Sequence, residues 1–219
     1  MQRHFDEALE QLKEKLLKMS SLVEQSIGSS IKALSERNSE LAYKVIKSDD
    51  AINMLEIEID DLCLKLLALY QPTAGDLRFI TSTMKINSDL ERIGDLAVNI
   101  AQRTLDLIKV PALKLKINIP QMATAAQAML KDSLNAFVNK DSKLAYEVCK
   151  RDDEVDYLNH EIFMALLSCK PEELTPVERV IDLVLVAKNL ERVADHSTNI
   201  CEDIIYMVDG KVIKHHITD

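Results

Sequence analysis

The sequence predicts an all-α fold, a tandem duplication of an antiparallel three-helix bundle with six helices in total. Composition is the first reason. Glycine and proline number only four and five, and aromatic residues make up 4% of the chain, whereas leucine, alanine, isoleucine, lysine, glutamate and aspartate dominate. Such a composition is typical of long helices. The second reason is an internal repeat, because two blocks of the first half recur about 100 residues later.

The repeat consists of two pairs of matched segments. LAYKVIKSDDAINMLEIEI at 41–59 matches LAYEVCKRDDEVDYLNHEI at 144–162, and LERIGDLAVNI at 90–100 matches LERVADHSTNI at 190–200. The offset is 103 residues for the first pair and 100 for the second. We therefore expect the second copy to have lost three residues in a loop between its two blocks.

The first copy divides into three predicted helices, at about 9–34, 39–69 and 73–110. Apolar residues recur in the first two at spacings of three and four, which indicates amphipathic helices with one buried side. The ERNSE and QPTAG stretches separate the three helices. Thr73 and Asp76 resemble a capping box at the start of the third helix, and Pro111 ends it.

The second copy repeats this plan. Two helices are predicted at about 121–139 and 141–168. A sixth begins after Thr175, the predicted N-cap, with Pro176 at its first position, and Gly210 suits its C-terminal cap. The predicted domains are a first bundle at 1–110, a linker at 111–120 and a second bundle at 121–219, related by a pseudo-twofold axis or laid end to end.

Charge and cysteine usage restrict the classes of function. A net charge of −9 without a dense lysine and arginine stripe disfavours nucleic acid as a partner. The chain has no run of 18 apolar residues, and its N-terminus is too polar for a secretory signal, so we expect a soluble, cytosolic protein. The cysteines are far apart and contain no C-x-x-C pair, which indicates reduced, packed thiols at Cys63, Cys149, Cys169 and Cys201.

Acidic residues form ridges on the predicted helices. A helix turns about 100° per residue, so Glu91, Asp95 and Asn99 share one side, opposite the apolar residues of their own helix. Asp49, Asn53, Glu56 and Asp60 share a side of the second helix. The equivalent ridges of the second copy contain Glu191, Asp195 and Asn199, and Asp152, Asp156 and Asn159.

Each copy therefore has two acidic ridges that could meet. Carboxylates four residues apart on adjacent helices supply several oxygen ligands within one turn, an arrangement that iron, manganese, magnesium or zinc accepts. The alternative is an ordinary solvated surface, ion-paired through Arg92 and Arg192. Periodicity alone leaves both interpretations open.

The LERIGD and ERVADH motifs at this separation, the GDLRFI segment at 75–80 and the duplicated plan over nearly all of the chain resemble the PhoU family. That resemblance implies two similar three-helix bundles with multinuclear metal clusters, iron foremost, on their surfaces. It implies ligand pairs from Glu91 with Asp95 and from Glu191 with Asp195. The partner helices would contribute Asp49 with Asn53 and Asp152 with Asp156. Asn53 departs from a fully acidic motif, so we expect the second site to be the stronger one.

The resemblance also implies regulation and no enzymatic activity. It predicts a negative regulator of the phosphate-starvation response, an adaptor that links the ATPase of a phosphate ABC transporter to a sensor histidine kinase and restrains uptake. The outward ridges and paired bundles favour a homodimer. An accessory regulator of another phosphate transporter is one alternative. A metal-dependent bundle enzyme is a second, which the missing E-x-x-H and H-E-x-x-H motifs disfavour.

Two smaller expectations concern residues beside these motifs. Arg78, Phe79 and Lys85 lie near the start of the third helix, where the helix dipole favours an anion, so direct phosphate binding there is a further alternative. His196 follows Asp195 but lies about 100° round the helix from it. We expect a surface or packing histidine and not a metal ligand.

Overall fold

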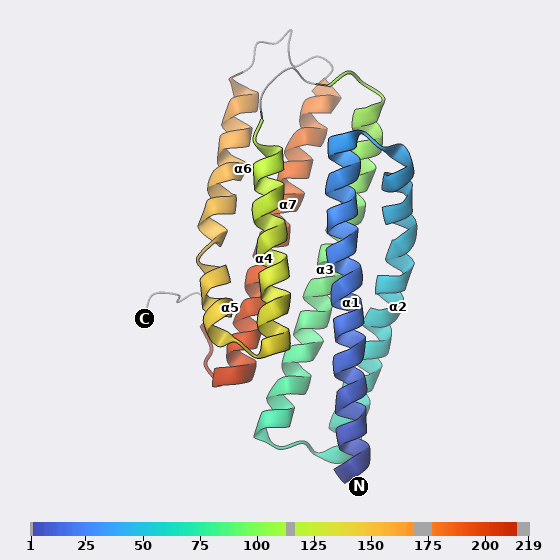
Figure 1. The fold of residues 1–219 in the computed structure, drawn as a ribbon, viewed down its shortest axis with the longest axis vertical. Helices are drawn as coiled ribbons and strands as arrows, with labels where there is room; N and C mark the ends of the chain where they lie inside the picture. The colour runs from blue at the N-terminus through green and yellow to red at the C-terminus, as the bar shows by residue number, and fades with distance from the viewer. Residues whose placement is uncertain (1, 113–116, 169–176, 214–219) are drawn as a thin grey trace.

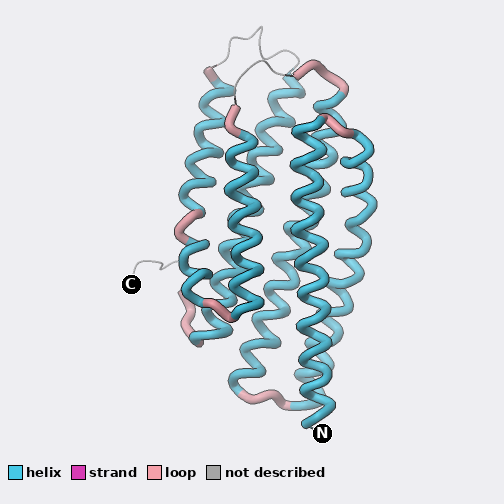
Figure 2. Tube along the Cα trace, in the orientation of Figure 1, coloured by secondary structure: helices cyan, strands magenta, loops and turns pink. Residues whose placement is uncertain are grey.

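The computed structural model describes residues 2–112, 117–168 and 177–213. Every regular element in these ranges is a helix (Figures 1 and 2). In chain order they are α1 (Gln2–Glu36), α2 (Ser39–Tyr70), α3 (Ala74–Ile108), α4 (Ile119–Asn139), α5 (Ser142–Cys149), α6 (Asp152–Leu167) and α7 (Val177–Asp209). The predicted all-α fold is confirmed.

The helix predicted at 141–168 is present as two helices, α5 and α6, with a short break between them (Figure 2). At the break the backbone N–H of Arg151 donates to the carbonyl of Val148 at 2.9 Å, three residues back instead of four. The guanidinium of Arg151 also pairs with Asp132 of α4 at 2.7 Å. The equivalent stretch of α2 is continuous, so the break belongs to the second copy alone.

The two copies pack side by side through α3 and α7 (Figure 1). In the first copy α1, α2 and α3 contact one another, and in the second α7 contacts α4, α5 and α6. Polar pairs join α3 to α7, among them Lys85 with Asp203, Asp89 with His196, and Arg103 with Asp182. Residue numbers rise along α3 as they fall along α7, so the helices are antiparallel. This relates the two copies by a pseudo-twofold axis and not by end-to-end stacking.

The predicted helix ends are mostly where the sequence places them. Thr73 is the N-cap of α3, but its hydroxyl contacts the Asp76 carboxylate at 3.5 Å and caps no backbone N–H. Asn38 caps α2 by accepting a backbone N–H at 3.0 Å. Gly210 ends α7 with a φ of 70°, the left-handed conformation that glycine adopts without strain. Thr175 and Pro176 lie outside the described residues.

Apolar residues from all seven helices form the core. Cys63, Cys149 and Cys201 are buried and unbridged, as predicted, whereas Cys169 lies outside the described residues. Within the described ranges no helix is both long and apolar enough to cross a membrane.

Candidate metal centres

The first acidic cluster lies where α2 packs against α3. Gly94 permits a close approach there, because a Cβ at that position would lie 3.2 Å from Cδ1 of Ile52 and 3.5 Å from Oδ1 of Asp49. The carboxyl group of Asp49 is thus placed over the turn of α3 that carries Glu91 and Asp95. The four ligands predicted for the first site therefore lie together, as the helical periodicity indicated: Asp49, Asn53, Glu91 and Asp95.

The carboxylates of this first cluster are close enough to perturb one another. Burial raises the pKa of Asp49; the hydrogen bond donated by Asn53 at 3.0 Å opposes this shift, and the nearby Asp95 adds to it. Burial also raises the pKa of Glu91, again with a contribution from Asp95. Arg92 lies 3.4 Å from both Glu91 and Asp95 and offsets part of their charge.

The second cluster lies between α6 and α7 and is more acidic. Burial raises the pKa of Asp152 to about 6, with further contributions from Asp195 and Asp156. The pKa values of Asp156 and Asp195 are raised by burial and then by Glu191. Lys188 forms an ion pair with Glu191. Four carboxylates therefore share one site whose like charges are only partly compensated.

Both clusters hold a buried carboxylate oxygen without a hydrogen-bond partner in the described structure at the same position of the repeat, namely Oδ1 of Asp49 and Oδ1 of Asp152. In the second cluster Oε2 of Glu191, which lies beside Lys188, is a further one. A buried acceptor without a donor costs about 1–3 kcal/mol, and native proteins contain few of them. A cation bound in each cluster would provide the missing partner of its buried oxygen. Carboxylate and amide oxygens are the ligands that hard cations prefer.

The side chains do not form a finished ligand set. Among the described residues, no group of three or more histidine, cysteine, aspartate or glutamate side chains is arranged to hold a metal ion. Arg92 and Lys188 lie against the carboxylates that would bind it. Metal binding would therefore require the side chains of Arg92 and Lys188 to move away and the carboxylates to rotate toward the metal ion. One basic side chain faces three predicted carboxylate ligands in the first cluster and four in the second. The exchange should therefore be more favourable in the second cluster.

Asn99 and Asn199 are not brought into the clusters. The amide of Asn199 lies 3.4 Å from the carboxylate of Asp89 on α3, and Asn99 is exposed without a hydrogen bond to the cluster in the described structure. His196 contacts the same Asp89 at 2.8 Å and is largely buried between the bundles. The prediction of a packing histidine is confirmed.

Two further residues belong to the clusters and were not among the predicted ligands. Glu56 contributes to the raised pKa of Glu91, and Asn159 donates to Glu191 at 3.4 Å. They occupy equivalent positions on α2 and α6. The helical wheel had placed both on the correct ridges, so the signal was available in the sequence.

The residues considered for direct phosphate binding make other contacts. Lys85 pairs with Asp203 at 2.9 Å, and Phe79 stacks on Phe137 with ring centroids 6.4 Å apart. Arg78 lies against Gly210 at the end of α7. All three positions pack α3 against the second copy.

Comparison with known proteins decides the family. A family model described as the PhoU domain matches the chain twice, at residues 16–104 and 119–204. The chain belongs to the PhoU family. The phosphate-specific transport system accessory protein PhoU homolog of Aquifex aeolicus is 43% identical over 212 residues, which cover 96% of each chain. PhoU of Serratia marcescens is 34% identical over a region that covers 96% of this chain and 87% of the Serratia protein.

Solved PhoU structures have the same fold. The crystal structure of PhoU from Pseudomonas aeruginosa superposes with a TM-score of 0.91 at 35% identity, over 94% of this chain and all of that one. The phosphate transport system regulatory protein PhoU from Streptococcus pneumoniae gives 0.86 at 30% identity, over 95% of this chain and 98% of that one. The duplicated bundle is therefore the PhoU fold.

Proposed function

We propose that this chain is an accessory protein of a phosphate-specific transport system that acts as a metal-binding negative regulator of the phosphate-starvation response. Membership of the PhoU family supports the link to phosphate transport, since relatives are named for it. The observation that carries the metal-binding part is the pair of buried, unpartnered carboxylate oxygens at Asp49 and Asp152. No catalytic role is proposed.

The bound cations would hold pairs of helices together. Asp49, Asn53, Glu91 and Asp95 would bind the first, and Asp152, Asp156, Glu191 and Asp195 the second. Iron is the foremost candidate, with zinc, manganese and magnesium as alternatives. When bound, the cation supplies positive charge that offsets the mutual repulsion of the carboxylates. Occupancy would then set how firmly α2 is held to α3 and α6 to α7.

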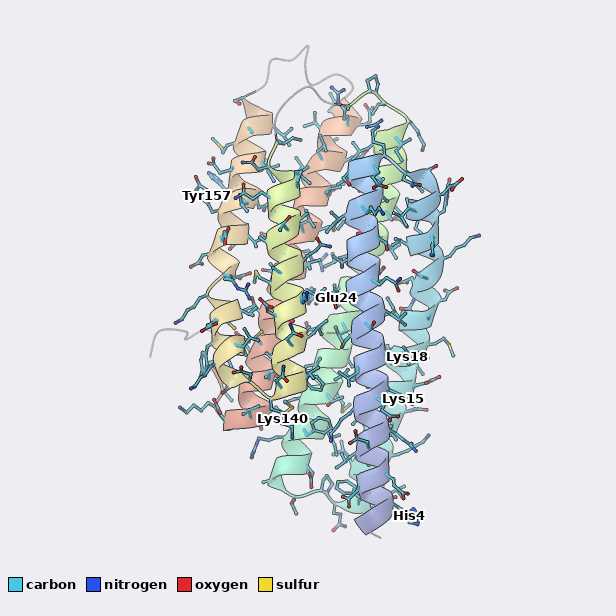
Figure 3. The ribbon with its side chains drawn as sticks, viewed as in Figure 1. His4, Lys15, Lys18, Glu24, Lys140 and Tyr157 are labelled. Atoms are coloured by element: carbon cyan, nitrogen blue, oxygen red, sulfur yellow. The ribbon has the colours of Figure 1, made fainter. Side chains whose placement is uncertain are left out.

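The proposed adaptor role requires surfaces for partners. The outer helices α2 and α6 expose apolar side chains at equivalent positions, Met54 and Leu64 on the first and Tyr157 and Leu167 on the second. Figure 3 shows Tyr157 on the outer side of α6. We propose that such faces contact the ATPase subunit of the phosphate ABC transporter and a sensor histidine kinase in the cytoplasm, and that the protein acts as a homodimer.

A deletion strain tests the regulatory proposal. We expect the strain to express alkaline phosphatase in phosphate-rich medium and the intact gene to restore repression. Repression that persists in the deletion strain would contradict negative regulation. A gene encoding Glu91→Ala together with Glu191→Ala should fail to restore repression. If that variant fully restored repression, regulation would not depend on the proposed metal sites.

Affinity purification distinguishes the adaptor from an accessory regulator of another phosphate transporter. The adaptor should co-purify with both the transporter ATPase and the sensor kinase. Recovery of a different transporter without the kinase would favour the alternative.

A further inference from the structure

A half-open pocket of about 440 Å³ lies between the two bundles, where the end of α1, the end of α3, the start of α4 and the start of α7 meet. These helix ends are at the top of Figure 1. Most of its walls are apolar side chains, among them Ile31, Leu34, Leu107, Ile119 and Leu183. Its volume falls within the range of small-molecule sites, about 300–1,000 Å³.

The opposite end of the molecule shows how this pocket arose. The pseudo-twofold axis relates Leu34 to Phe137 and Arg179 to Phe79. At the lower end the two phenylalanine rings stack between the bundles with centroids 6.4 Å apart. At the upper end a leucine and an arginine replace the two rings, and the pocket occupies that junction. The two copies have thus diverged at two positions of this junction.

Among the described residues that line the pocket, the two charged side chains are both arginines, although the chain as a whole has a net charge of −9. Arg179 is only 8% exposed, and its Nη1 donates to the carbonyl of Pro111 at 2.9 Å. Arg37 donates from Nη2 to the carbonyl of Leu107 at 2.8 Å. These backbone contacts hold two guanidinium groups at the pocket. No carboxylate is among the described residues that line it.

We infer that this pocket binds an organic anion with an apolar chain and a carboxylate head group. The apolar walls bury the chain, and Arg37 attracts the head group through a charge-assisted hydrogen bond. A neutral ligand of the same length gains only the apolar contacts. None of the residues of the two acidic clusters lines the pocket, so the inference does not depend on metal binding.

Calorimetric titration of the full chain with decanoate and with decanol, below the concentration at which micelles form, tests this inference. We expect decanoate to bind at a single saturable site and decanol to bind about tenfold more weakly, the difference expected of one charge-assisted interaction. Equal affinities for the two ligands, or no saturable binding of decanoate, would overturn the inference.

Three variants locate the site. Arg37→Gln should weaken decanoate binding about tenfold. Lys140→Gln is the matched control, because Lys140 is the equivalent residue at the lower end of α4 (Figure 3), and it should leave binding unchanged. Leu183→Trp places a larger side chain in the pocket and should abolish decanoate binding. This variant tests the site even if Arg37→Gln does not fold. Equal losses in Arg37→Gln and Lys140→Gln, or full binding by Leu183→Trp, would contradict the site.

Discussion

Asp49 and Asp152 occupy equivalent positions in the two copies, and each holds one carboxylate oxygen buried without a hydrogen-bond partner in the described structure. A solvated acidic face would leave such oxygens in contact with water. Periodicity in the sequence could not separate that interpretation from a metal site. The recurrence of the same buried, unpartnered atom in both bundles favours the metal site, because an unpartnered acceptor is costly and gains most from a cation.

The raised pKa of Asp152, about 6, predicts how metal-free protein responds to pH. Its unfolded pKa is near 3.9, so the folded state binds more protons between about pH 4 and 6 and loses stability as pH rises through that window. Asp152→Asn should therefore raise the melting temperature at pH 7.5, by about 2–4 °C for each kcal/mol of repulsion removed, and raise it less at pH 5.

Thermal unfolding of chelator-treated protein at the two pH values measures this effect. Glu161→Gln removes one charge at an exposed position of the same helix, α6, and serves as the control. The same change in melting temperature at pH 5 and pH 7.5 would show that ionisation of Asp152 does not destabilise the fold.

Asn53 should limit the first metal site. Asn53→Asp removes the hydrogen bond to Asp49 and adds a carboxylate, so it should lower metal-free stability and raise the affinity of the first cluster for Mn²⁺ about tenfold. Asp156→Asn should weaken the second cluster in the reciprocal way. Ala51→Asp adds the same charge at an exposed position of α2 and should change neither property by a comparable amount. Titration of each variant with Mn²⁺ measures these affinities. An unchanged Mn²⁺ affinity in Asn53→Asp would refute the assignment of residue 53 as a metal ligand.

Gly94 should be required for the close packing of α2 on α3. An alanine Cβ there would lie 3.2 and 3.3 Å from two carbons of Ile52, whose β-branched side chain has little rotamer freedom in a helix. The strain should outweigh the gain in helix propensity, so we expect Gly94→Ala to lower the free energy of unfolding by about 1 kcal/mol.

Gly75 provides the matched control on the same helix. A Cβ there meets nothing within 4 Å, so Gly75→Ala should raise the free energy of unfolding by about 0.5 kcal/mol. Urea unfolding compares the two variants. Equal stabilisation by both would show that the two helices have room to separate at Gly94.

The sequence predicted the helices and the acidic ridges because both depend on local periodicity. The pairing of Asp49 with the Glu91 turn followed from adjacent helices in one bundle. The break in the helix predicted at 141–168 could not be predicted in this way, because it involves an ion pair between Arg151 and Asp132 of another helix.

Contacts between the two copies also could not be predicted from helical periodicity. Asn199 shares a helix face with Asp195, yet its amide contacts Asp89, because the antiparallel packing of α3 on α7 brings that carboxylate within 3.4 Å. The pocket has the same origin. The exchange of Phe79 for Arg179 is visible in the aligned repeat, but its consequence appears only once the pseudo-twofold axis places the two residues at opposite ends of the molecule.

The most direct test of the central claim is the metal content of the protein. Protein purified without chelator or nickel affinity should contain iron or another of the proposed metals by elemental analysis. The double variant Glu91→Ala and Glu191→Ala should lose most of it while remaining helical by circular dichroism. Equal metal content in the two proteins would contradict the assignment of these carboxylate clusters as metal centres.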